Sequence, residues 1–137
     1  MKRSLIAGAA VLAAWMLLDL IAHRFVLAPI YEATASLWRP FDQMNVALIY
    51  TVTVVLIGVF VGIYSLLVRP KSLGAGLVLG ALVGLALGIS SGFGTFIHMP
   101  MPISLAWGWL TLGWLKGLVA GGIIGALIVD PLSGPAR

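Results

Sequence analysis

The hydrophobic positions of this chain fall into four long runs separated by short polar segments. The runs cover about residues 4–29, 45–68, 73–97 and 104–129. Each run exceeds the roughly 20 residues that a helix needs to cross a hydrocarbon core about 30 Å thick. Because lipid offers no partner to a free backbone amide, runs of this length predict helices. The pattern therefore predicts an all-α integral membrane protein, a bundle of four transmembrane helices that forms a single domain over 1–137.

The longest polar segment, residues 30–44, is expected to be a loop that carries a short helix or an ordered turn. Tyr31 and Trp38 lie in it, and aromatic side chains of this kind prefer the interface between lipid and water. Pro70 is expected to end the second helix and Pro131 the fourth, because the residue before a proline is held out of helical geometry.

Composition and charge place the chain in the same class. Hydrophobic residues make up 61% of the 137 residues and charged residues 9%, whereas soluble domains average roughly 45–50% and 25%. The net charge is +4, but the basic residues lie mostly at helix ends, so we expect the lipid bilayer as a partner and no nucleic acid. The absence of cysteine excludes disulfides and thiolate metal sites.

Basic residues in the short loops predict the orientation of the helices. One predicted side of the membrane carries Lys2, Arg3, Arg69, Lys71 and Arg137, and the other carries Arg24 and Arg39. Because loops rich in Lys and Arg stay in the cytoplasm, both termini are expected there, with residues 30–44 outside. The expected location is a bacterial inner (plasma) membrane.

The first and third predicted helices resemble each other. Aligning Arg3–Ile21 with Lys71–Ile89 gives identities at seven positions, which are Ser4, Leu5, Ala7, Gly8, Ala13, Leu17 and Ile21. This similarity predicts two helix hairpins of the same orientation, which is a parallel repeat.

Glycines at four-residue spacing are the strongest local pattern. The third helix carries Gly76, Gly80, Gly84, Gly88 and Gly92, the fourth carries Gly113, Gly117, Gly121 and Gly125, and the second carries Gly58 and Gly62. Residues four apart share one helix face, and a face without side chains lets another backbone approach closely in lipid. Two interpretations stay open: an antiparallel hairpin of the third and fourth helices, or a glycine zipper that binds another subunit.

Few ionisable residues lie inside the apolar runs. Asp19 and His23 are four residues apart and share a helix face, and Lys116 reaches a similar depth from the fourth helix. The two levels differ by about one helical turn, so a contact between Asp19 and Lys116 is feasible, with His23 above it. The same half of the bundle holds further polar side chains that we expect around a pocket: Tyr50, Thr51, Thr53, Ser90, Ser91, Thr95 and His98. The alternative is structural, since paired charges can also fix helix register.

A weaker hypothesis places a metal at this end of the bundle. His23 and His98 lie on the same predicted side, and Met99 and Met101 add two thioethers. Histidine together with methionine suits copper(I). The sequence predicts no particular cofactor.

Two functions remain open from the sequence. The first is a small non-catalytic polytopic protein that associates through its glycine-zipper faces, as a homo-oligomer or as an accessory subunit of a larger membrane complex. The second is binding or transport of a small solute, an ion or a proton in a pocket around Asp19, His23 and Lys116. We expect no enzymatic activity, because the sequence contains no phosphate loop, nucleophile elbow or paired acidic motif.

Overall fold

The computed structural model describes residues 1–130, and every regular element within them is a helix or a helical turn. Four helical segments are long and apolar enough to cross a membrane, namely Lys2–Val26, Val46–Leu67, Leu73–His98 and Ile103–Leu127. The expected all-α architecture with four long apolar helices is therefore confirmed. The predicted helix stop at Pro131 and the basic charge of Arg137 lie outside the described residues.

Two of the long helices are each followed by a π-helical turn and then by a short α-helix. The first series is α1 (Lys2–Ile21), the π turn Ala22–Val26 and α2 (Ala28–Ala33), and the second is α4 (Leu73–Ile89), the π turn Ser90–Gly94 and α5 (Thr95–His98). The other long helices are α3 (Val46–Leu67) and α6 (Ile103–Leu127). Between α2 and α3 lie two 3₁₀ turns, Ala35–Leu37 and Phe41–Gln43.

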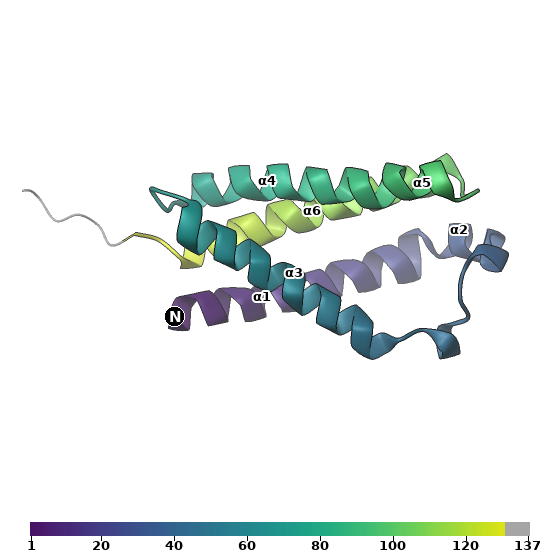
Figure 1. Cartoon of the computed structure of the whole chain (residues 1–137), viewed down its shortest axis with the longest axis horizontal. Coiled ribbons are helices and arrows are strands. Elements are labelled where there is room, and N and C mark those ends of the chain that lie inside the picture. Colours follow the sequence, from purple (N-terminus) through teal and green to yellow (C-terminus); the bar gives the residue numbers. More distant parts are fainter. Residues whose placement is uncertain (131–137) are drawn as a thin grey trace, which may run out of the picture.

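Side-chain caps define where α3 and α4 begin. The backbone N–H of Leu48 donates to Asn45 Oδ1 at 3.0 Å, and that of Ala75 donates to Ser72 Oγ at 3.1 Å. Each cap satisfies an amide that the first helical turn leaves unpaired. In Figure 1, α2 and α5 lie at one end of the molecule, which we call the α2 end, and Met1 lies at the other.

The glycines of α4 and α6 face one another across an antiparallel hairpin. Gly76, Gly80, Gly84 and Gly88 are buried. A Cβ placed on Gly84 would lie 2.8 Å from Gly117 Cα, and one on Gly113 would lie 2.7 Å from Gly88 Cα. The same backbone contact extends to Gly92, Gly121 and Gly125. Of the two interpretations left open by the sequence, the structure contains the intramolecular hairpin, and its close contact occupies these glycine faces.

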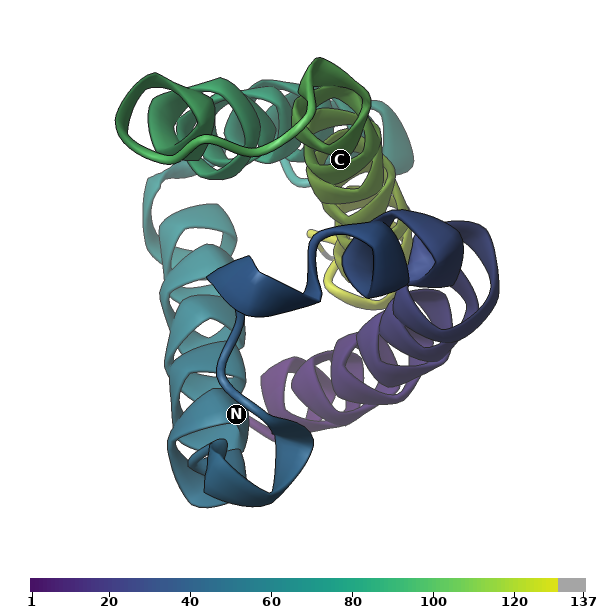
Figure 2. The same cartoon turned by 90° about the vertical axis from the view of Figure 1, so that its right-hand side faces the viewer.

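α3 packs against the rest of the protein through only one half of its length. Its second half contributes Ile57, Phe60, Val61 and Tyr64 to a buried core shared with residues of α1 and α6. Its first half leaves apolar side chains exposed, and Val55 is 57% exposed. Figure 1 shows α3 running obliquely across α1, and Figure 2 shows the start of α3 set apart from the end of α1.

The two π turns directly follow the two aligned segments. α1 ends at Ile21 and α4 ends at Ile89, a separation of 68 residues, which is also the separation of Arg3 and Lys71 in the alignment. A π turn follows directly in both cases. π turns are rare in α-helices and are often found at functional sites.

Candidate functional site

The ion pair expected from the sequence is present between α1 and α6. Lys116 Nζ donates to both carboxylate oxygens of Asp19, each at 2.8 Å. The Lys116 ammonium also lies 4.7 Å from the centroid of the Trp15 ring, a favourable cation–π distance. Trp15 Nε1 donates to the Lys116 carbonyl oxygen at 2.9 Å. Trp15 therefore holds both the backbone and the charged group of Lys116.

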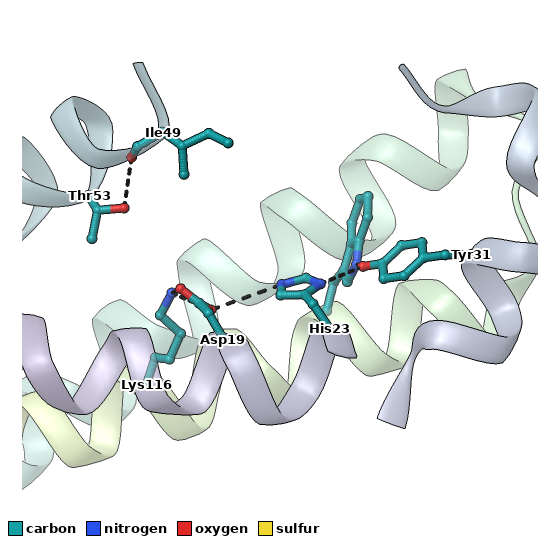
Figure 3. A network of polar contacts seen from close by, with 7 residues as sticks. Asp19, His23, Tyr31, Ile49, Thr53 and Lys116 are labelled. Atoms are coloured by element: carbon teal, nitrogen blue, oxygen red, sulfur yellow. Dashed lines mark hydrogen bonds and ion pairs between the residues drawn. The ribbon is translucent and has the colours of Figure 1, made fainter. Parts of the chain in front are cut away.

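A second set of polar contacts continues from Asp19 toward the α2 end (Figure 3). His23 Nε2 lies 4.0 Å from Asp19 Oδ1, which is too long for a hydrogen bond. His23 Nδ1 lies 2.7 Å from the Tyr31 hydroxyl oxygen, and Trp109 Nε1 donates to the same oxygen at 2.7 Å. The indole can only donate, whereas a phenolic oxygen can both donate and accept, so the direction of the contact between Tyr31 and His23 follows the tautomer of His23.

The tautomer of His23 sets the direction of its contact with Tyr31. Burial raises the pKa of the Tyr31 phenol above its ordinary value of 10.0, so the hydroxyl keeps its proton at neutral pH. If Nδ1 accepts that proton in a hydrogen bond, the proton of a neutral imidazole must be on Nε2. The Nε2–H then faces the side of the site that holds Asp19.

Aromatic packing holds Tyr31 in place. The Tyr31 and Trp38 rings meet edge to face, with centroids 5.7 Å apart, and Trp38 lies 5.8 Å from Trp109. Trp38 Nε1 also donates to Thr34 Oγ1 at 2.9 Å. The sequence predicted aromatic residues in this segment only as interfacial anchors. The contact of Tyr31 with His23 depends on how α2 folds back over α6.

Two neighbouring cavities share lining residues beside the ion pair. The larger, of about 440 Å³, is walled by apolar side chains that include Leu56, Val59 and Phe60 of α3 and Val83 and Leu87 of α4. The smaller, of about 230 Å³, is lined by polar side chains that include Asp19 and His23. Ser91, Gly113 and Lys116 line both. We call the two together the cleft; it has one apolar part and one polar part.

The cleft includes some of the polar residues expected from the sequence and omits others. Ser91 lines both of its parts, and its hydroxyl donates to the Gly88 carbonyl oxygen at 3.3 Å. Tyr50, Thr51 and Thr95 line neither part. Tyr50 and Thr51 belong to the half of α3 that diverges from the bundle, and the Thr51 hydroxyl donates to the Ala47 carbonyl oxygen at 2.8 Å. Thr53 in Figure 3 bonds in the same way to Ile49, at 2.9 Å.

The residues of the metal hypothesis lie in different surroundings. Met101 is 4% exposed and packs with Leu27 and Leu105, whereas His98 is exposed at the end of α5. Within residues 1–130, no three His, Asp or Glu side chains are grouped in a way that could hold a metal ion. This observation does not test a site built from histidine and methionine, so copper binding stays a prediction.

The chemistry of the cleft follows from its two parts. The ion pair carries no net charge, because one ammonium faces one carboxylate. Its surroundings supply hydrogen-bonding groups next to an apolar space, and pockets that bind small molecules combine a mostly apolar lining with a few placed polar groups. The chain matches no protein-family model, no curated protein and no solved structure.

Proposed function

We propose that this protein is a non-catalytic, multi-pass membrane protein that binds a small amphiphilic molecule in the cleft beside Asp19 and Lys116. The observation that carries the proposal is the position of Lys116, which lines both the polar and the apolar part of the cleft. A charged pair inside a membrane span is costly and is commonly found at a functional site. A volume of about 440 Å³ lies within the usual range for small-molecule sites, roughly 300–1,000 Å³.

Native mass spectrometry of the protein, released gently from its own membranes, tests this proposal. We expect the wild-type protein to carry the extra mass of a bound molecule. Val83→Trp should abolish that mass, because Val83 lines the cleft and an indole would fill the space. Val78→Trp is the matched control on the same helix, since Val78 is 62% exposed and lies outside the cleft lining.

Two outcomes of the mass measurement would contradict the proposal. A wild-type protein without any added mass would contradict ligand binding under the conditions in which the protein is made. An added mass that persists in Val83→Trp would locate the bound molecule elsewhere.

A second candidate function is association with another membrane protein. The observation that favours it is on α3, where a Cβ on Gly58 or Gly62 would meet nothing within 4 Å. Gly58 is exposed and Gly62 is partly buried, and small residues favour helix contacts in lipid. The glycines of α4 and α6 are poorer candidates for binding a partner, because they already contact each other.

Bilayer insertion, with both termini in the cytoplasm of a bacterial cell, is part of the proposal. The support is the concentration of Lys2, Arg3, Arg69 and Lys71 at the end of the molecule opposite α2, because basic loops are retained in the cytoplasm. Transport through the cleft would additionally require it to open toward that basic end.

Cysteine labelling tests the proposed topology, and the native chain contains no cysteine to interfere. We expect Ser36→Cys, between α2 and α3, to react with an impermeant maleimide in intact cells. Ser72→Cys, between α3 and α4, should react only after the membrane is opened. The reverse pattern would invert the topology, and equal labelling of both in intact cells would contradict a membrane-spanning arrangement.

A further inference from the structure

The polar part of the cleft has more hydrogen-bond donors than its own groups use. A lysine ammonium carries three N–H groups, and at most two of those on Lys116 are directed at Asp19, with both oxygens at 2.8 Å. His23 Nε2 is a further donor in the tautomer in which Tyr31 donates to Nδ1, and Asp19 Oδ1 lies 4.0 Å from it. The Ser91 hydroxyl hydrogen is already directed to Gly88. Lys116 can therefore donate to an acceptor on a bound molecule, and so can His23 in that tautomer.

The charge balance of the site limits the kind of acceptor. Asp19 lies directly against Lys116 and cancels its charge. An anionic head group would meet the Asp19 carboxylate as well as the ammonium, and a cationic head group would meet Lys116. Like charges at such distances disfavour binding, most strongly where water is excluded. An uncharged acceptor experiences neither repulsion.

The apolar part of the cleft indicates how such a molecule reaches the site. Its walls on α3 and α4 are exposed, with Leu56 38%, Val59 54% and Leu87 41% exposed. In a membrane this side of the bundle faces lipid. A molecule dissolved in the bilayer can therefore pass between α3 and α4 with its chain against these side chains and its head group directed to Lys116.

We propose that the occupant of the cleft is an uncharged, carbonyl-bearing amphiphile from the bilayer, whose carbonyl oxygen accepts a hydrogen bond from Lys116 and whose apolar chain lies between α3 and α4. This inference rests on the proposed function and specifies its ligand class. The two π turns carry His23 and Ser91, which line the same polar part and are 68 residues apart, the same separation as in the aligned segments.

Photo-crosslinking of the full chain in vesicles tests the ligand class. Three probes share one 16-carbon chain with a diazirine near its end and differ only in the head group: a methyl ester, a free carboxylate and a primary ammonium. We expect the methyl ester to label Leu56–Phe60 and Val83–Leu87 at least about tenfold more than either charged probe, the scale expected for one hydrogen bond plus avoided repulsion. Labelling is located by mass spectrometry of the digested protein.

Charge-changing variants provide the internal control. Asp19→Asn leaves the lysine charge unbalanced, so the preferred probe should change from the ester to the carboxylate. The double variant Asp19→Asn with Lys116→Met keeps the site uncharged but removes the lysine donor, so ester labelling should fall about tenfold. The double variant also avoids an unpaired charge that could prevent folding.

The outcomes separate this inference from the proposed function. Equal labelling by all three probes within the cleft, blocked by Val83→Trp, would overturn the uncharged carbonyl ligand while leaving a binding cleft. A preference that does not change in Asp19→Asn would also overturn it. Labelling of the cleft no stronger than labelling around Val78, with no native mass lost in Val83→Trp, would overturn both proposals.

Discussion

Gly80→Ala is expected to destabilise the protein by about 1–3 kcal/mol, the usual cost of forcing an extra methyl group into a packed contact. The added Cβ would overlap the carbonyl oxygen of Gly117 and lie 3.0 Å from Gly121 Cα. Both neighbours are backbone atoms, so no side-chain rotation can relieve the overlap, and α4 must move away from α6. The loss can be measured as a shift of the unfolding midpoint when the protein in mild detergent is titrated with a denaturing detergent.

Gly58→Ala is the matched control, because it makes the same chemical change where nothing lies within 4 Å. Alanine is a better helix former than glycine by up to about 1 kcal/mol, so this variant should be unchanged or slightly more stable. Equal losses for Gly80→Ala and Gly58→Ala would contradict the close α4–α6 contact. A shift in oligomeric state with Gly58→Leu alone would instead support the second candidate function.

Lys116→Met is expected to have the second large effect, because it leaves the Asp19 carboxylate without the partner that lies 2.8 Å away. An unpaired charge within a membrane span costs about 2.5–3.5 kcal/mol on insertion scales. We therefore expect a lower unfolding midpoint than for the wild-type protein. The methionine keeps the contact with the Trp15 ring, since a thioether also packs well on aromatic rings.

The matched test for this effect is a double-mutant cycle with Asp19→Asn. Removing both charges should restore most of the lost stability, with a coupling free energy of about 1–3 kcal/mol between the two positions. If the losses of stability in the two single variants simply add in the double variant, the two side chains do not interact. A double variant that is as stable as the wild type but lacks the bound mass would assign the pair to binding instead of helix register.

Much of the fold was predictable because helices long and apolar enough to cross a membrane follow from local composition. The predicted second run, about residues 45–68, differs by one residue at each end from α3, Val46–Leu67. The pairing of Asp19 with Lys116 was predictable for a related reason, since the rise of about 1.5 Å per residue converts sequence position into depth. Two charges at similar depth on neighbouring helices then have few other partners.

The rest of the site could not be predicted, because it depends on distances between helices that no local pattern contains. Tyr50 and Thr51 were expected beside the cleft, but the tilt of α3 carries them away from it. Trp15, Tyr31 and Trp109 were not expected in the site, and they hold Lys116 and His23 through contacts that join α1, α2 and α6.

The amino-acid sequence by itself determined that this chain forms four long apolar helices, which residues have the same depth, and which faces lack side chains. Only the tertiary structure decided that the glycine faces of α4 and α6 contact each other and that α3 diverges to leave a cleft at the ion pair. The physical reason is that hydrophobicity and helix geometry act along the chain, whereas the choice of which faces meet depends on the close packing of all four helices at once.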